Sequence, residues 1–136
     1  MATPTKVYSF ALALGTKKHN LATDQLVVAL TNTAPTTATT QLSDITQVSY
    51  TYCSTRNITT TSFTQSVGVS SLVLADLVLT ASGGSIGPFQ YVVVYNDTAT
   101  NDEVICFIDY GTAVTVTDGN TFTIDFTDSQ QLLTIA

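Results

Sequence analysis

Threonine constrains what this chain can fold into more than any other residue, because 27 of its 136 residues are threonine. The β-branched side chain of threonine fits a pleated strand and loses rotamer entropy in a helix. Apolar residues alternate with polar ones in several short runs. Phe122, Ile124 and Phe126 alternate with threonine and aspartate, and residues 113–117 repeat the pattern. An alternation of period two is typical of half-buried antiparallel strands.

Ten segments of the chain meet these criteria for strands. We expect strands at Val7–Leu14, Leu26–Asn32, Gln47–Cys53, Ile58–Gln65, Ser71–Thr80, Phe89–Asn96, Glu103–Asp109, Ala113–Thr117, Thr121–Phe126 and Leu132–Ile135. Short strands in this number predict an all-β fold, an antiparallel β-sandwich of about 8–10 strands with jelly-roll or immunoglobulin-like topology. The length suits a single β-sandwich domain over residues 1–136, with the N-terminal segment as an interaction arm.

Turn-forming residues separate the expected strands. Asp118-Gly119 lies between two alternating runs and predicts a tight hairpin that joins them. Residues 32–41 lack periodicity and are expected to form a surface loop. We expect at most one short helical turn, near residues 22–25 or 42–46.

The charge of the chain is low and unevenly distributed. Charged residues make up 10 % of the chain, against about 25 % in an average soluble domain, and the net charge is −6. Lys6, Lys17, Lys18 and Arg56 are the only cations, whereas residues 61–136 carry only acidic charges. So few cations neutralise few phosphates, which disfavours nucleic acid and anionic membranes as partners. The basic N-terminal part either meets an acidic surface on a protein partner or is simply solvated.

Residue types that carry catalysis or bind metals are scarce. The single histidine, His19, follows two lysines without a nucleophile motif and is expected to be an exposed loop residue. His19, Cys53 and Cys106 do not form a zinc signature, and residues 96–103 lack the spacing of a calcium loop. Glu103 is the only glutamate, so a glycosidase pair of carboxylates is disfavoured. We therefore expect no catalytic residue, no cofactor and no metal, and a protein that is not an enzyme.

The cysteines and tyrosines are expected mainly as core residues. Cys53 and Cys106 each lie in an apolar strand pattern, which favours two free thiols over one disulfide bond. Tyr91 and Tyr95 share a predicted strand face with a valine between them. Core packing or a subunit contact is favoured for such tyrosines, and a sugar-binding platform is the alternative.

Membrane insertion and secretion are not indicated by the sequence. No segment approaches the ~18 consecutive apolar residues of a membrane span. Val7–Leu14 is similar to a short signal-peptide core, but only Lys6 precedes it and no small-residue cleavage site follows. We interpret this segment as the first strand and expect synthesis and assembly in a host cytoplasm.

Two segments carry a resemblance to a known class of proteins. One runs from Thr80 to Thr98 through the sequence SGGSIGPFQYVVVYND and is followed by IDYG at residues 108–111. The other is Leu26–Asn32 with the Thr-Ala-Pro that follows it. Over residues 20–136 the chain resembles small proteins of tailed bacteriophages that decorate or cement the capsid.

The resemblance implies a structural role in the virion. Decoration proteins sit on the capsid exterior, often as homotrimers, and bridge neighbouring subunits of the major capsid protein through many modest contacts that must break together. The expected location is therefore the outside of the phage head. The alternatives are a tail component (tail tube, terminator or fibre-associated domain) and a module that binds carbohydrate or a host receptor. The candidate partner-binding residues, chosen for their positive charge or their place beside it, are Lys6, Lys17, Lys18, His19 and Arg56.

Overall fold

Strands dominate the structure, a computed structural model that describes residues 4–126 and 133–135. Its elements in chain order are β1 (Thr5–Lys6), α1 (Phe10–Gly15), β2 (Leu26–Thr31), η1 (Leu42–Asp44), β3 (Asn57–Ile58), β4 (Thr60–Ser66), β5 (Val69–Leu74), β6 (Leu77–Thr80), β7 (Ile86–Asn96), β8 (Val104–Val116), β9 (Thr121–Ile124) and β10 (Leu133–Ile135). The predicted all-β fold is confirmed. The 3₁₀ turn η1 falls within residues 42–46, where a short helical turn is expected from the sequence.

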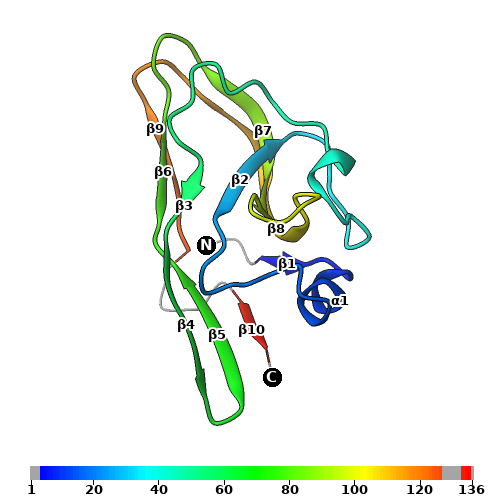
Figure 1. Ribbon diagram of the computed structural model, residues 1–136. Helices are drawn as coiled ribbons and strands as arrows, with labels where there is room; N and C mark the ends of the chain where they lie inside the picture. Colours follow the sequence, from blue (N-terminus) through cyan, green and yellow to red (C-terminus); the bar gives the residue numbers. More distant parts are fainter. Residues whose placement is uncertain (1–3, 127–132, 136) are drawn as a thin grey trace.

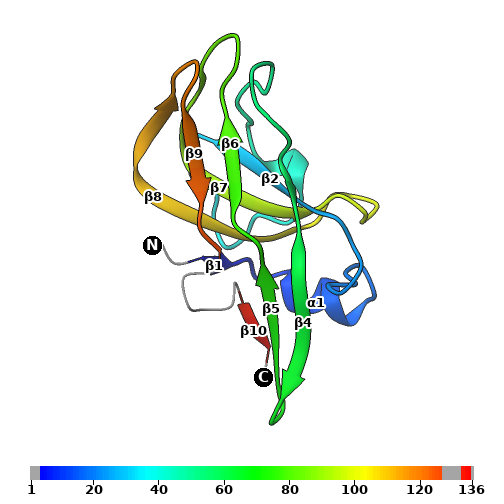
Figure 2. The same ribbon diagram turned by 90° about the vertical axis from the view of Figure 1, so that its left-hand side faces the viewer.

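The strands form three antiparallel sheets in two layers. The largest sheet has the order β1-β8-β7-β2-β3, and two smaller sheets have the orders β10-β5-β4 and β6-β9. Because β5 leads into β6 after two residues, the smaller sheets form one layer in front of the large sheet, and their strands cross its strands steeply (Figure 2). The predicted antiparallel β-sandwich is confirmed, with layers that cross rather than run parallel.

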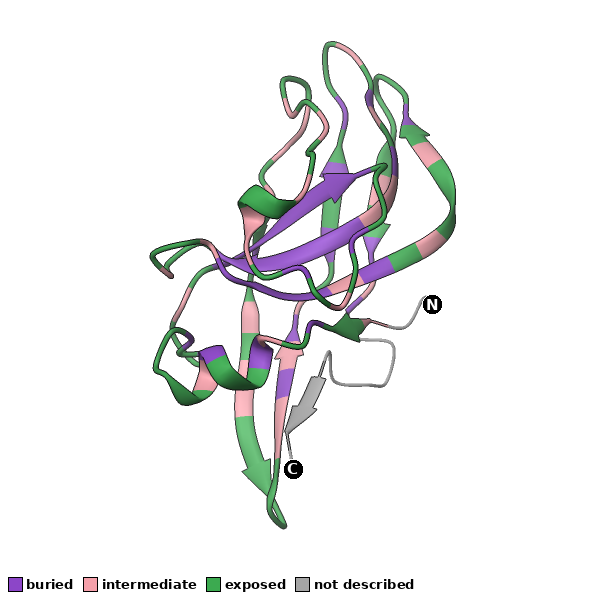
Figure 3. Cartoon of the chain, turned by 90° about the vertical axis from the view of Figure 1, so that its right-hand side faces the viewer, coloured by how far each residue is buried: buried purple, intermediate pink, exposed green. Residues whose placement is uncertain are grey.

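The centre of the large sheet supplies much of the core. All six residues of β2 are buried, and its pairing with β7 places Val28 opposite Val94 and Leu30 opposite Val92. Leu79 of β6, in the other layer, belongs to the same cluster of buried apolar side chains. Burial on both faces explains why β2 is a continuous apolar run rather than an alternating one. Figure 3 shows this band of buried strands.

The first predicted strand, Val7–Leu14, is wrong, because the helix α1 occupies most of it (Figure 1). Leucine and alanine alternate in this run, and both are better helix formers than β-branched residues. Phe10 and Ala13 are buried at a spacing of three, which places both on the inner face of the helix. An apolar run this short is compatible with the period of a helix and with that of a strand. Its leucine and alanine content favours the helix.

The predicted strand Gln47–Cys53 is also wrong. Beyond one isolated bridge between Cys53 and Ala81, the segment has no strand pairing. It contacts β2 through single bonds: Val48 N–H donates to the Leu30 carbonyl, and the Tyr50 hydroxyl accepts from Leu30 N–H at 2.9 Å. A side-chain hydroxyl thus takes the place of a backbone partner for β2.

Other predicted strands are divided, joined or shortened. Ile58–Gln65 is split between β3 and β4, and Ser71–Thr80 is split between β5 and β6 at Ala75-Asp76. Glu103–Asp109 and Ala113–Thr117 are joined in the long strand β8. The last predicted strand, Leu132–Ile135, corresponds to β10, and Leu132 lies outside the described residues.

The predicted hairpin at Asp118-Gly119 is wrong, although the tight turn itself is present. Asn120 N–H donates to the Thr117 carbonyl at 3.0 Å and closes the turn. The strands on its two sides have different partners, because β8 pairs with β7 and β1, whereas β9 pairs with β6. The turn therefore carries the chain from one layer of the sandwich to the other.

The β4–β5 hairpin extends beyond the rest of the fold (Figure 1). Its two-residue tip, Val67-Gly68, has positive φ angles of 51° and 78°, which define a tight turn of the kind that suits twisted hairpins. Val67 is 96 % exposed, and Figure 3 shows exposure increasing toward the tip. A β-branched residue at positive φ is unusual, so this tip is conformationally strained.

Candidate functional site

The structure brings three of the five predicted partner-binding residues together. Lys17, Lys18 and His19 follow α1 and line one hollow of about 350 Å³. The hollow is also lined by Asn20 and Asp24 of the same loop and by Thr98, Ala99, Thr100 and Glu103. Lys6 lies apart from them in β1, which pairs with β8. The site is therefore built where the loop after α1 meets the β7–β8 connection.

Arg56, the remaining predicted residue, makes its contacts within the chain. Its guanidinium carbon lies 3.7 Å from the centroid of the Tyr50 ring, and Nη1 donates to the Val28 carbonyl at 2.7 Å. A planar guanidinium suits both stacking on an aromatic face and hydrogen bonding at its edge. Arg56 therefore fastens the segment before β3 to β2, away from the hollow that contains Lys17 and Lys18.

His19 is buried, so the expected exposed loop residue is wrong. Only 6 % of its surface is exposed, and its ring stacks on Phe10 of α1 with centroids 5.7 Å apart. The Nδ1 atom lies 3.0 Å from Asn96 Nδ2 at the end of β7. The lysines before His19 suggest solvent exposure, but α1 and the strand end close over the ring.

Asn96 fixes the orientation of this histidine. The Asn96 side-chain oxygen accepts from the N–H groups of Thr98 and Ala99, at 3.0 and 3.2 Å. Its amide nitrogen is therefore the donor toward His19 Nδ1 and toward Asp24 Oδ2, which lies 2.7 Å away. Since Nδ1 must accept, this network assigns the neutral ring proton to Nε2.

Burial sets the protonation of His19. Desolvation lowers the pKa of His19 below its usual value of 6.5, and the nearby carboxylates of Glu103 and Asp24 only partly oppose this effect. A buried ring whose Nδ1 accepts a hydrogen bond also has no room for a second ring proton at that atom. His19 is therefore held as a neutral group that links α1 to the sheet.

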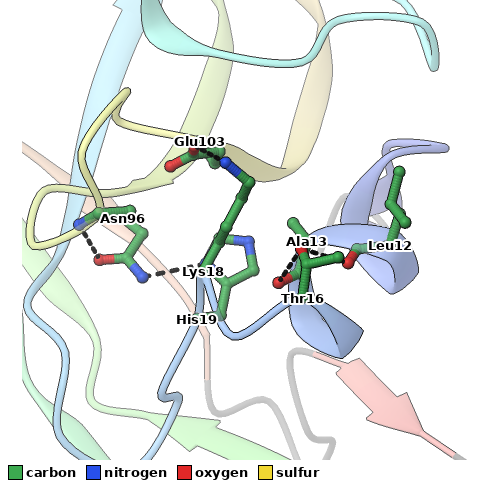
Figure 4. Close-up of polar contacts among 8 residues, drawn as sticks. Leu12, Ala13, Thr16, Lys18, His19, Asn96 and Glu103 are labelled. Carbon is green, nitrogen blue, oxygen red and sulfur yellow. Dashed lines mark hydrogen bonds and ion pairs between the residues drawn. The ribbon is translucent and has the colours of Figure 1, made fainter.

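Glu103 stands beside this histidine and pairs with Lys18 (Figure 4). Lys18 Nζ lies 3.4 Å from Glu103 Oε1, and Glu103 is only 8 % exposed. Glu103 Oε2 and His19 Nε2 are buried and have no hydrogen-bond partner within the described part of the chain. Most buried polar atoms in folded proteins have a hydrogen-bond partner, so these two atoms are the polar groups of the site whose hydrogen bonds the described residues leave unmade.

A second hollow lies beside α1 and shares Lys18 and Glu103 with the first. Its volume is about 310 Å³, and Leu12, Ala13 and Thr16 of the α1 region line it together with Thr40, Gln41, Ser9 and Asn101. Leu12 is 70 % exposed at its border, and Tyr8, just before the helix, is 78 % exposed. Both residues of the ion pair therefore line both hollows, and the second hollow also includes the exposed apolar side chain of Leu12.

Sequence reasoning missed Tyr8, Leu12 and Asn96. The two apolar residues lie within the run interpreted as a strand, and only a helical period would have placed Leu12 on the outside. Asn96 precedes an aspartate at a strand end, which resembles an ordinary turn, and its partners Asp24 and His19 are distant in sequence. The neighbouring residues in the sequence therefore do not predict this hydrogen-bond network.

The cysteines match the expectation of two free thiols. Cys53 is half-buried and Cys106 is fully buried, and no disulfide joins them. Burial raises the pKa of the Cys106 thiol to about 12 and also raises the pKa of Cys53. Tyr95 is 4 % exposed, as a core tyrosine should be, and Tyr91 is half-buried.

Neither a metal site, nor a membrane-spanning helix, nor a known relative indicates a function for the described residues. Across residues 4–126 and 133–135, no three His, Cys, Asp or Glu side chains are grouped so that they could hold a metal ion. No helix in this part of the chain combines the length and the apolar character needed to cross a bilayer. Comparisons with protein-family models, curated proteins and solved structures find no match.

Proposed function

We propose that this protein is a structural virion component that decorates the outside of a phage head and bridges major capsid subunits. The observation that carries the proposal is the exposed face of α1. Leu12 of α1, together with Tyr8 just before the helix, presents a large apolar side chain to solvent, and Leu12 lines one hollow with Lys18. Exposed apolar side chains bordered by polar and charged groups are typical of protein interfaces.

Two further features support a role in building a lattice. The charge-poor, threonine-rich chain folds as a β-sandwich, and its sequence resembles decoration proteins over residues 20–136. A protein bound at many equivalent lattice positions needs only modest affinity at each, because bridging contacts reinforce one another. A small interaction face on α1 is sufficient for such a role.

Binding of purified variants to undecorated heads of the same phage tests this proposal. Leu12→Ser and Lys17→Glu change exposed side chains, and each is expected to weaken binding at least about tenfold, equivalent to 1.4 kcal/mol. Lys18 is unsuitable for charge reversal because it pairs with the buried Glu103. Val78→Ser is the matched control, since Val78 is 49 % exposed on β6, outside the proposed face.

Unchanged binding of both α1 variants would remove this face from the proposal. Labelled antibody fragments in electron micrographs of intact virions then locate the protein itself. Label over the shell supports decoration, whereas label confined to the tail would assign the protein to the tail. The number of copies per virion gives an independent check, because a shell lattice offers far more equivalent positions than a tail.

A further inference from the structure

We propose that the outer edge of β4 is a self-association site, at which β4 of a second copy of this chain pairs antiparallel about Phe63. This would join two hairpins into one continuous sheet. Figure 2 shows β4 as the outermost strand of its sheet, with β5 and β10 on its other side. Within the described residues, the outer side of β4 has no backbone hydrogen-bond partner.

β4 differs from the other outermost strands in length. Among the described strands, β1 and β3 have two residues each, β10 has three, and β6 and β9 have four each, whereas β4 has seven. Short edges are one way in which proteins prevent unwanted strand pairing. β4 is long enough to template a partner strand.

β4 also lacks the charges that usually protect an exposed edge. Residues 57–75 contain no Asp, Glu, Lys, Arg or His, and β4 contains no proline. Two copies that each carry a net charge of −6 repel each other overall. The hairpin is where they can approach without placing like charges opposite each other, which favours a second copy of this chain over a charged partner.

The register of the hairpin determines which backbone groups of β4 point outward. Ser66 pairs with Val69 across the two-residue tip, and in such a turn this closing pair is hydrogen-bonded. Hydrogen-bonded and non-hydrogen-bonded pairs then alternate, so the N–H and C=O groups of Gln65 and Phe63 face outward. Phe63 is therefore able to exchange both backbone bonds with Phe63 of a second copy.

A two-fold axis between the two copies of Phe63 gives favourable side-chain pairs at the centre of the strand, beyond the irregular register between Thr60 and Ser62. It would place Thr60 opposite Ser66, Thr61 opposite Gln65, Ser62 opposite Thr64, and Phe63 opposite itself. Hydroxyl–hydroxyl and aromatic–aromatic pairs stabilise antiparallel strands. The sequence of β4 is thus nearly symmetric in chemistry about its centre, as a self-complementary interface requires.

This two-fold pairing differs from the three-fold assembly that the resemblance to decoration proteins implies. It uses β4, whereas the proposed capsid contact uses α1. Dimerisation is measured on the isolated protein, so its result does not depend on whether the protein binds phage heads. An interface of one strand is small, so we expect a reversible dimer that forms at high protein concentration.

Sedimentation equilibrium of the full chain over a wide concentration range tests the proposal, with variants at Ser62 and Thr64. Ser62 is the first regularly paired residue after the bulge between Thr60 and Ser62, Thr64 lies beyond it, and the two residues oppose each other in the proposed pair. Ser62→Lys with Thr64→Lys would place lysine opposite lysine and is expected to weaken dimerisation at least about tenfold. Ser62→Glu with Thr64→Lys is the matched control, because it changes the same positions but places opposite charges together.

The supporting result is a wild-type dimer that is lost in the double-lysine variant and retained in the Glu/Lys variant, with both variants folded by circular dichroism. A wild type that remains monomeric at the highest concentration would overturn the proposal. So would a trimer, or a dimer that survives the double-lysine change.

Discussion

Asn96 donates a hydrogen bond to Nδ1 of His19 across a distance of 3.0 Å, although the two residues are 77 positions apart. The bond connects the end of β7 with the loop that follows α1. Since Asn96 also bonds Asp24, Thr98 and Ala99, a single fully buried amide joins the loop between α1 and β2 to the connection between β7 and β8. The position of α1, and with it the proposed capsid contact, depends on this amide.

Asn96→Ala should therefore destabilise the protein strongly. The change removes one amide and leaves the buried Nδ1 of His19 and the part-buried groups of Asp24, Thr98 and Ala99 without this partner, so we expect a loss of about 2–4 kcal/mol in the free energy of unfolding. Urea unfolding followed by circular dichroism measures it. Asn101→Ala, at an exposed asparagine in the same connection, is the control and should change stability by less than about 0.5 kcal/mol. Equal losses in the two variants would contradict the role of Asn96.

Stability should decrease as the pH falls through the range in which histidine titrates. The pKa of His19 is lowered in the folded chain, so below 6.5 the unfolded chain binds the proton more readily. The stabilisation is complete above that pH and is lost as the pH decreases. Urea unfolding from about pH 7.5 to about pH 5.5 should show this slope. His19→Gln, whose side-chain oxygen can accept from Asn96 without titrating, should show none, because His19 is the only histidine.

Val67→Asn should stabilise the hairpin tip. Val67 has φ 51° and is 96 % exposed, so the change loses no packing and replaces a strained β-branched residue by one that tolerates this conformation. We expect a gain of about 1 kcal/mol in thermal or urea unfolding. Val69→Asn, two residues further along in β5, makes the same chemical change without a positive φ. A gain of equal size there would disprove the explanation by strain.

The two thiols should differ in reactivity. Cys106 is fully buried with a pKa of about 12, whereas Cys53 is half-buried and its pKa is raised less. Because the thiolate is the reactive form, a colourimetric thiol reagent at neutral pH should modify Cys53 slowly and Cys106 only after unfolding. Cys53→Ser should abolish labelling of the native protein. Rapid native labelling of that variant would show that Cys106 is accessible.

The alternation of apolar and polar residues predicted the all-β class of the fold well, because the same alternation of buried and exposed residues is present in the structure. In β9 and the residues after it, Ile124 and Phe126 are buried, whereas Thr121 and Thr123 are exposed, as the alternation predicts. The failures arise where partners are distant. The turn at residues 118–119 is encoded locally, but which sheet each flanking strand joins depends on packing between layers.

The candidate site was harder to predict for the same reason. The sequence places Lys17, Lys18 and His19 in one loop, but the burial of His19 depends on Phe10, Asn96 and a neighbouring strand end. Arg56 is predicted to contact a partner because it is a lone cation in a charge-poor chain. Its contacts with Tyr50 and the Val28 carbonyl within the chain are not visible in the sequence, because these residues are distant or carry no local signal.

The uncharged hairpin has a consequence for how assembly responds to ionic strength. Dissolved salt screens attraction between exposed charges but has little effect on backbone hydrogen bonds between neutral strands. Contacts that involve Lys17 should therefore weaken as salt is added, while pairing along β4 persists. With these two kinds of surface at separate places in the fold, added salt should weaken the proposed contact at α1 without weakening the proposed pairing along β4.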